Sequence, residues 1–292
     1  MADIAQLPLI VIVGPTASGK TSLALELARA CGGEIICADS RTIFKGMDIA
    51  TAKPTHAEQA SVPHWGLDLV EPGEYYSAAD FQSYAQQKIR DIRARGHIPF
   101  LVGGTGLYVD AVVFNYEFGP PANQHLRTEL QQLSLEQLHE YCDKYNVRLP
   151  ENKHNKRYVI RAIETRNSVP RRDSNPVKNT IIVGIATDTP VLRLRIESRA
   201  EQLFQDGVVQ EATVLGKKYG WDNQAMTSNI YPLLRDYLAG SMTLEMVQST
   251  FVTQDWRLAK RQLTWLRRNR FIHWLSLEDA RIYLATQLAI YG

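Results

Sequence analysis

The feature that most constrains this chain is the segment of residues 14–21, which reads Gly-Pro-Thr-Ala-Ser-Gly-Lys-Thr. It fits the pattern G-x-x-x-x-G-K-S/T, in which backbone N–H groups close around phosphate oxygens and a helix dipole favours the anion. An apolar run at 9–13 precedes it as a buried strand should, and residues 21–30 follow as an amphipathic helix. This context predicts a phosphate-binding loop in which Lys20 reaches the terminal phosphate and Thr21 reaches a phosphate oxygen or Mg²⁺.

Composition and cysteine usage limit the class of protein. The chain has 292 residues and is 45% hydrophobic, enough for one large domain or two small ones with a real core. Its three scattered cysteines form no C-x-x-C pair, which argues against a disulfide scaffold or a zinc site and favours a reducing compartment. Because the sequence has neither a secretory leader nor an apolar stretch of membrane-spanning length, we expect a cytoplasmic protein without a membrane partner.

The charged residues are distributed unevenly, although the net charge is only +2. Residues 153–178 hold eight Lys or Arg and two Asp or Glu, a local charge of +6, so the rest of the chain sums to −4. Residues 257–270 hold six more basic residues and no acidic one. Two such tracts on a nearly neutral chain favour a polyanionic partner, whereas two solvated helix faces are the simpler alternative.

Strand and helix signals alternate along the first third of the chain. A second apolar run lies at 34–38, residues 41–63 are predicted as loop, and residues 77–80 predict a capped helix start. A third apolar run at 99–102 is followed at once by glycines. Strands joined to helices by short links are typical of a parallel sheet. We therefore expect an α/β fold, a P-loop NTPase-like core with a parallel sheet flanked by helices.

The pattern changes near residue 116. Short polar helices and a proline-bearing linker follow, so residues 116–179 are predicted as a small all-helical insertion domain. An apolar run at 180–187 returns to the sheet, so that residues 1–115 and 180–292 form the core. Further helices are expected at 191–203, 232–238, 244–254, 255–268 and 277–289, with a short strand at 269–275.

Asp39 is the first acidic residue to consider at the predicted phosphate site. It follows the apolar run at 34–38, which we place next to the strand of the phosphate loop, at the sheet edge where open α/β folds bind ligands. The run at 99–102 ends in glycines and offers no carboxylate there. Asp39 is therefore expected to act as a metal ligand or a general base, and a turn cap is the simpler alternative role.

Basic side chains of two predicted helices are candidate anion ligands. Arg195 and Arg199 lie a turn apart and both are able to face a phosphate group. Pairing with Glu197 or Glu201 is equally compatible with this spacing. The predicted helix at 255–268 has a basic flank beside an apolar stripe, which suits contacts with a nucleic-acid backbone.

In order along nearly the whole chain, five segments resemble the motifs of the tRNA dimethylallyltransferases, also called tRNA isopentenyltransferases. Residues 14–21 look like the first motif of that family. Ala-Asp-Ser at 38–40, with Lys-Gly-Met-Asp-Ile-Ala-Thr-Ala-Lys-Pro at 45–54, is similar to the second, and Gly-Gly-Thr-Gly-Leu-Tyr at 103–108 to the third. Residues 155–164 resemble the family's anticodon-arm segment and residues 258–268 its C-terminal signature.

The resemblance implies a reaction and a set of site residues. Members transfer the dimethylallyl group of dimethylallyl diphosphate to N6 of the adenine just 3′ of the tRNA anticodon, with Mg²⁺ and release of diphosphate. The implied catalytic residues are Asp39, Thr21, Lys20 and Arg199, with Thr21 also a metal ligand. The implied diphosphate ligands are Gly14, Thr16, Ala17, Ser18, Gly19, Lys20, Thr21 and Arg195. The implied contacts with the anticodon arm are Asp39, Ser40, Arg41, Thr42, Thr105, Arg157, Arg161, Lys260, Arg261, Gln262, Trp265 and Arg268.

Two segments depart from the family's usual pattern. Arg41 and Thr42 stand where a methionine and a glutamine are usual, and Ile230 and Pro232 where a glycine and a basic residue are usual. Three other interpretations stay open: an adenylate (AMP or ADP) isopentenyltransferase, a small-molecule kinase, and a tRNA-binding relative that has lost catalysis. The second basic tract argues against the first of these, and the intact phosphate loop argues against the last. We expect the protein to be a monomer.

Overall fold

The computed structural model describes residues 7–120, 123–166, 168, 171–228 and 230–291. Its contacts divide the chain into two compact units, Met1–Val113 with Pro176–Gly292 and Phe114–Asn175. The sequence-based bounds of the insertion, 116–179, stay a prediction about domain organisation. Residues 176–179 belong to the first unit by contact, because the N–H of Val177 bonds to the carbonyl of Val113 at 2.8 Å.

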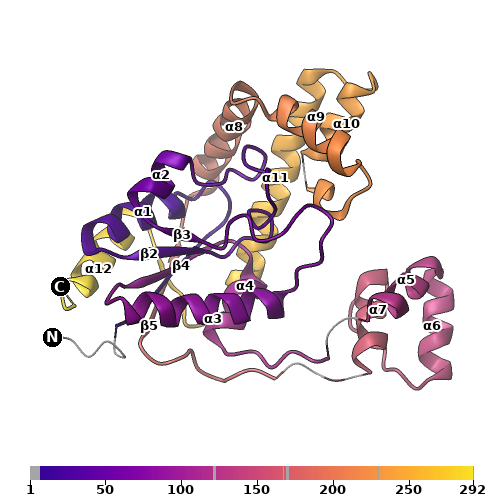
Figure 1. Ribbon diagram of the computed structural model, residues 1–292, viewed down its shortest axis with the longest axis horizontal. Coiled ribbons are helices and arrows are strands. Elements are labelled where there is room, and N and C mark those ends of the chain that lie inside the picture. Colours follow the sequence, from indigo (N-terminus) through magenta and orange to yellow (C-terminus); the bar gives the residue numbers. More distant parts are fainter. Residues whose placement is uncertain (1–6, 121–122, 167, 169–170, 229, 292) are drawn as a thin grey trace. The chain divides into compact units, whose positions relative to one another are not determined.

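The first unit is built on a parallel sheet, which confirms the predicted α/β fold. Within the described residues, six strands lie in the order β3-β2-β4-β1-β5-β6 (Figure 1). They are β1 (Leu9–Val13), β2 (Glu34–Cys37), β3 (His64–Trp65), β4 (Pro99–Gly103), β5 (Thr180–Ile185) and β6 (His273–Leu275). Every residue of β1, β2 and β4 is buried, as a sheet covered on both faces requires of its central strands.

The position of β2 in the sheet differs from the one we expected. The neighbour of β1 is β4, which pairs Phe100 with Ile10 and Gly103 with Val13, and β2 pairs with the other edge of β4. The prediction that Asp39 follows a strand adjacent to the phosphate-loop strand is therefore wrong. The chain passes from β2 to the edge strand β3 and returns through α3 (Ala78–Ala94) to β4, which lies between the first two strands.

Two glycines at the end of β4 let the segments that follow β1 and β2 approach each other. A Cβ atom on Gly103 would lie 2.1 Å from the carbonyl oxygen of Ala38, which precedes Asp39. A Cβ atom on Gly104 would lie 3.1 Å from the carbonyl oxygen of Gly14, the first residue of the phosphate loop. Because neither glycine has a side chain, the two loops can lie close together despite the strand between them.

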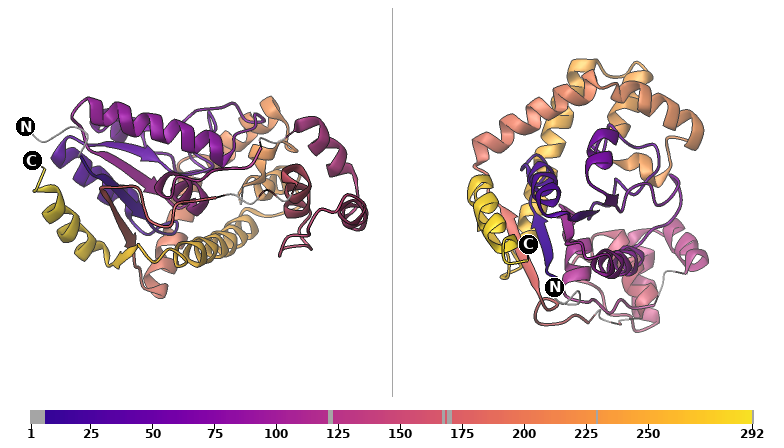
Figure 2. Two further views of the ribbon diagram at one scale, coloured as in Figure 1. Left: turned by 90° about the horizontal axis from the view of Figure 1, so that it is seen from below. Right: turned by 60° about the vertical axis from the view of Figure 1, so that its left-hand side comes forward.

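Helices cover both faces of the sheet. α1 (Lys20–Cys31) and α12 (Leu277–Leu288) pack on one face, against Ile10, Ile12 and Phe100 among others. α3 and α4 (Gly106–Val113) pack on the other face (Figure 2). No helix of the described residues is long and apolar enough to cross a membrane.

Four further helices of the first unit enclose the loop after β2. They are α8 (Thr189–Gln205), α9 (Val208–Tyr219), α10 (Tyr231–Leu238) and α11 (Leu244–Leu266). The loop inserts Ile43, Phe44 and Met47 into the apolar cluster that these helices form. The loop that follows β2 is thereby held against helices from the last third of the chain.

The second unit has its own small core. Its helices are α5 (Gln124–Gln132), α6 (Leu135–Lys144) and α7 (Lys156–Thr165), which pack around Leu138, Cys142 and Val159. Ser134 forms a capping box at the start of α6. The buried carboxylate of Glu164 accepts two hydrogen bonds from Arg127, each of 2.6 Å.

Three expectations about helices are wrong. The helices expected at 244–254 and 255–268 are one helix, α11, whose buried positions Phe251, Asp255 and Ala259 continue without a break. Residues 41–63 are not all loop, because Thr55 caps a short helix, α2 (His56–Ser61). The helix α9, which begins after Gly207 in the left-handed conformation, was not predicted.

We predict that Gly103→Ala destabilises the protein more than Gly240→Ala. The added methyl group at Gly103 would meet backbone atoms of Ala38, which cannot move aside, and should lower the free energy of unfolding by about 3 kcal/mol or more. At Gly240 the space is open but φ is +76°, so only backbone strain of about 1 kcal/mol is expected. Urea unfolding measures both variants, and equal losses would contradict the close approach across β4.

Candidate active site

A cavity of about 810 Å³ lies at the C-terminal ends of β1, β2 and β4. One wall is the phosphate loop with the start of α1. The facing wall, which we call the acceptor wall, consists of residues 39–42 and 50–54. Side chains of α8 and α11 complete the lining, including Arg195, Arg199 and Asp255.

The phosphate loop has the conformation that its sequence predicts. Gly19 adopts φ of +91° at the start of α1, a conformation natural for glycine. The N–H of Ser18 bonds to the carbonyl of Pro15 at 3.3 Å, which closes the loop on itself. The buried hydroxyl of Ser18 has no hydrogen-bond partner among the described residues. A buried polar atom without a partner suits a site that a ligand completes.

Side chains from α8 and α11 that line the cavity also bond to the phosphate loop. The N–H of Thr16 donates to Oε1 of Gln262 at 2.8 Å, and its hydroxyl donates to the buried carboxylate of Asp255 at 3.5 Å. The same hydroxyl accepts a hydrogen bond from Arg199. Arg195 donates to the carbonyl of Ser18 at 3.2 Å. Residues far apart in the sequence thus fix the loop that starts α1.

These contacts settle one question that the sequence left open. Arg195 and Arg199 turn toward the phosphate loop, and no ion pair of either with Glu197 or Glu201 occurs in the part of the chain that the structure describes. Two guanidinium groups beside the phosphate loop make the surroundings strongly attractive to an anion.

Opposing effects of its surroundings set the pKa of Lys20. Its ammonium donates to the carbonyl of Pro15 at 3.1 Å. Its pKa is lowered from 10.5 to about 8, chiefly by burial and also by the positive charge of Arg199, while the carboxylates of Asp39 and Asp255 act in the opposite direction. Lys20 is therefore still largely protonated at neutral pH and available to an anionic ligand.

A network of short-range hydrogen bonds fixes Asp39 and its neighbours on the acceptor wall. Oδ1 of Asp39 accepts a hydrogen bond from the N–H of Arg41 at 2.8 Å, so the carboxylate also serves as the turn cap considered above. The N–H of Ser40 donates to the hydroxyl of Thr105 at 3.1 Å, and the hydroxyl of Thr42 donates to the carbonyl of Asp39 at 3.4 Å. The glycine-rich turn after β4 thus supports Asp39 through Thr105.

Basic side chains near the C-terminal end of α11 and just after it line a second, shallow pocket of about 470 Å³, and Arg261 lines both pockets. The residues of the second pocket are Arg257, Lys260, Arg261, Thr264, Trp265 and Arg268. Trp265 anchors this surface because its indole N–H donates to the carboxylate of Asp110 at 2.8 Å. A Cβ atom on Gly106 would lie 2.0 Å from Trp265, so the third glycine of the turn serves this packing. The guanidinium of Arg268 lies 5.6 Å from the indole ring centre.

The structure brings most of the predicted site residues to the linings of these two pockets, but Gly14 lines neither pocket, and Arg157 and Arg161 lie in the second unit. Gln262, expected to contact tRNA, bonds to the phosphate loop and lines the large cavity. Arg157 and Arg161 belong to the second unit, where Arg157 is exposed. Arg161 is bound to Glu164 at 3.2 Å.

Sequence reasoning missed Asp255 and Lys53, both of which are buried and line the cavity. Asp255 had a detectable signal, because it interrupts an apolar stripe at the helical spacing of Phe251 and Ala259. An acidic residue on the buried face of a helix needs a partner, which here is Thr16. Nothing in the local sequence distinguishes Lys53 from an exposed lysine.

The fold and the site define a P-loop α/β protein whose loop faces an acidic residue across a cavity, and comparisons with known proteins identify its family. The model of the IPP transferase family matches residues 42–269, and the chain belongs to that family. It is 38% identical over 287 residues to the tRNA dimethylallyltransferase of Desulforudis audaxviator, with 93% of each chain covered. For the tRNA dimethylallyltransferase of Bacillus subtilis the identity is 36% over 287 residues, with 92% and 91% covered. The resemblance found in the sequence is thereby confirmed.

Solved structures agree with this assignment. The tRNA isopentenylpyrophosphate transferase of Bacillus halodurans has a TM-score of 0.73 and 35% identity, with 97% of both chains covered. A eukaryotic dimethylallyltransferase described as acting on tRNA has a TM-score of 0.76 over 92% of this chain and 73% of its own. At 23% identity, that second likeness shows the fold alone.

We predict that inorganic pyrophosphate binds more weakly as the pH rises through about 8. Lys20 is protonated below its pKa of about 8 and neutral above it, so its attraction for the anion is lost on the alkaline side. Between pH 7 and 9 the loss should be about tenfold. Lys20→Arg, which stays charged, is the control and should give a flatter profile in calorimetry. If the affinity for pyrophosphate fell equally with pH in the wild-type protein and in Lys20→Arg, Lys20 would be excluded as the titrating ligand.

Proposed function

We propose that this protein transfers the dimethylallyl group of dimethylallyl diphosphate to N6 of the adenine 3′-adjacent to the tRNA anticodon. Membership of the IPP transferase family makes it a tRNA-modifying prenyltransferase. The observation that carries the proposal is the pairing of a phosphate loop and two arginines with a carboxylate on the opposite wall of one cavity. Its cytoplasmic location and monomeric state stay predictions.

The donor's diphosphate fits the wall formed by the phosphate loop. Loop N–H groups, Lys20, Arg195 and Arg199 provide positive charge on several sides of an anion placed there. Breaking the bond between the allylic carbon and oxygen leaves negative charge on diphosphate, and these donors stabilise it as it develops. Arg199 has an N–H, at Nε, that is buried and has no partner among the described residues. A diphosphate oxygen would supply that partner.

Mg²⁺ suits the oxygen donors at the start of α1. No cluster of three or more His, Cys, Asp or Glu side chains is present in the described part of the chain. Mg²⁺ often needs only one or two protein oxygens when it also binds phosphates and water. The hydroxyl of Thr21 and the carboxylate of Asp39 line the same cavity and are oxygen donors of that kind. Bound there, the ion would neutralise charge on the leaving diphosphate.

In the proposed reaction, Asp39 assists the attacking amine. The exocyclic amine of adenine forms the new bond to carbon and must lose a proton, which a nearby carboxylate can accept. Reaching this cavity requires the base to leave its stack in the anticodon loop. In this arrangement the acceptor wall, which also contains Ser40, Arg41 and Thr42, contacts the extruded base or its neighbours.

The basic surface of α11 is suited to the phosphate backbone of the anticodon arm. Lys260, Arg261 and Arg268 are exposed, and Trp265 presents an aromatic face beside them. Such a surface contacts phosphates by charge and can stack on an unpaired base. Arg157 and Arg161 of the second unit are proposed as further contacts. An enzyme acting on free adenylate would have no use for either set.

A transfer assay tests the proposal. Purified protein is incubated with Mg²⁺ and labelled dimethylallyl diphosphate, with unmodified tRNA in one reaction and AMP in another. We expect label in tRNA, located at the adenine 3′ to the anticodon, and its loss when EDTA removes the metal. Label in AMP alone would favour the adenylate isopentenyltransferase. Bound but unlabelled tRNA would favour a relative that has lost catalysis.

We predict that Asp39→Asn lowers turnover about a hundredfold or more and leaves tRNA binding intact. The amide oxygen can still accept the hydrogen bond from Arg41, so the local turn is preserved while the basic carboxylate is removed. Asp222→Asn, at an exposed position that does not line the cavity, is the control. Single-turnover transfer and filter binding separate the two effects. Near-normal turnover would remove Asp39 from the mechanism.

We predict that replacing Arg261 and Arg268 by glutamate weakens tRNA binding and makes that binding less dependent on salt concentration. Removing two phosphate contacts should reduce the slope of log K against log salt concentration by about 1.5. Lys217→Glu, an exposed change on α9, is the matched control and should leave the slope unaltered. An unchanged slope in the double variant would place the α11 surface away from the tRNA backbone.

A further inference from the structure

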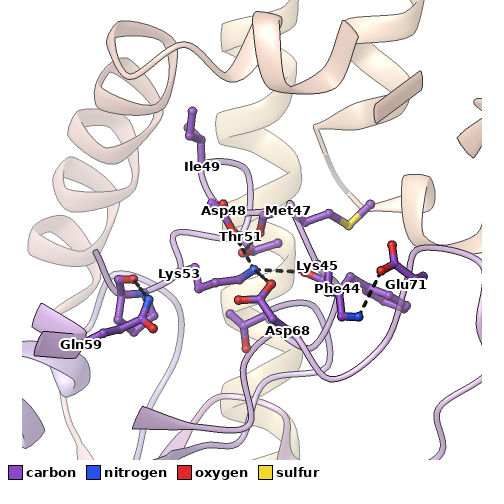
Figure 3. Close-up of polar contacts among 12 residues, drawn as sticks. Phe44, Lys45, Met47, Asp48, Ile49, Thr51, Lys53, Gln59, Asp68 and Glu71 are labelled. Carbon is purple, nitrogen blue, oxygen red and sulfur yellow. Dashed lines mark hydrogen bonds and ion pairs between the residues drawn. The ribbon is translucent and has the colours of Figure 1, made fainter. Parts of the chain in front are cut away.

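Lys53 is a buried lysine whose ammonium is fully occupied by partners from its own neighbourhood (Figure 3). It donates to the carbonyl of Phe44 at 3.0 Å, to Asp48 at 2.6 Å and to Asp68 at 2.7 Å. Three acceptors use all three of its N–H donors. We call these four residues the Lys53 cluster. Although Lys53 lines the cavity, its ammonium is committed to the cluster and is not a free ligand for phosphate.

The Lys53 cluster joins two stretches of chain that support the acceptor wall. Phe44 and Asp48 belong to the turn that leads into residues 50–54, and Lys53 is one of those residues. Asp68 belongs to a neighbouring stretch of chain, and its own backbone N–H bonds to the carbonyl of Thr42 at 3.2 Å. The cluster therefore ties together both parts of the acceptor wall, residues 39–42 and 50–54.

The outer side of the same turn has a separate attachment. The carboxylate of Glu211, on α9, accepts hydrogen bonds from the N–H groups of Asp48, Ile49 and Ala50 at 2.8, 2.6 and 3.0 Å. The turn would thus stay attached to the helices if Lys53 were replaced. Loss of Lys53 should loosen the cavity side of the turn without unfolding the protein.

The charges and exposed fractions of the clustered side chains support the expectation that the protein stays folded without Lys53. The Lys53 side chain is 2% exposed, whereas Asp48 and Asp68 are 56% and 45% exposed. Without the ammonium, the two carboxylates repel each other but are hydrated, so they can separate at modest cost. Their separation would move the residues on which the acceptor wall rests.

We propose that Lys53 is a positioning residue that fixes the acceptor wall for the tRNA adenine and has no direct part in binding the donor. The proposal rests on the proposed function and assigns the two substrates to different walls of the cavity. Diphosphate binds at the phosphate loop, which the Lys53 cluster does not touch. A change at Lys53 should therefore affect the tRNA substrate selectively.

The test compares Lys53→Met with Lys45→Met. Lys45 lies in the same turn, and its ammonium forms an exposed ion pair with Glu71 at 3.1 Å, so the loss of its side chain should have little effect. For Lys53→Met we expect kcat/KM for tRNA to fall about thirtyfold, within the range expected for a misplacement of about 1 Å. The affinity for inorganic pyrophosphate, measured by calorimetry, should match that of the wild type.

A second variant keeps the test decisive if Lys53→Met folds poorly. Adding Asp48→Asn and Asp68→Asn removes the repulsion, so the triple variant should fold normally and still be deficient toward tRNA. Either of two results would overturn the proposal: unchanged kcat/KM for tRNA in a folded variant, or an equal loss of pyrophosphate affinity.

Amide hydrogen exchange provides a readout that does not depend on activity. We expect residues 42–54 to exchange faster in Lys53→Met than in Lys45→Met, and equal exchange would show that Lys53 does not fix the turn. If the wild-type protein transfers no label to tRNA, the proposed function fails by itself, and this exchange measurement still decides whether Lys53 anchors the wall.

Discussion

The site depends first on the hydrogen bonds that connect the phosphate loop to α8 and α11. Thr16 is bonded to Gln262 and Asp255 of α11 and to Arg199 of α8. These side chains fix the loop and line the same cavity as the loop does. The same contacts bring Arg195 and Arg199 beside the loop, so one set of bonds both shapes the binding site and supplies its positive charge.

The second requirement is that the two walls of the cavity meet across a strand. β4 separates β1 from β2, and side chains at its end would keep Asp39 away from the phosphate loop. Gly103 and Gly104 remove that obstacle, and Gly106 admits the indole of Trp265. The glycine-rich turn therefore contributes by allowing three close approaches within the fold, and Thr105 adds a hydroxyl that supports the backbone beside Asp39.

Features set by neighbouring residues could be predicted from the sequence, and features set by remote contacts could not. The phosphate loop and the capping box at Ser77 depend on a few adjacent positions, and each was predicted. The bond between Thr16 and Gln262 joins residues 246 positions apart, so no local pattern indicates it. The order of the strands and the burial of Lys53 likewise follow from packing. Asp255 was detectable in principle, but the helix was divided at that residue.

The most direct test of this account is a crystal structure of the protein with tRNA and a thiodiphosphate analogue of the donor that reacts slowly. The account predicts the diphosphate group on the phosphate loop with Arg195 and Arg199, and the extruded adenine against the acceptor wall. Its N6 atom should lie about 3 Å from the carboxylate of Asp39. An adenine bound elsewhere, or a diphosphate that bridges to the acceptor wall instead of the loop, would contradict it.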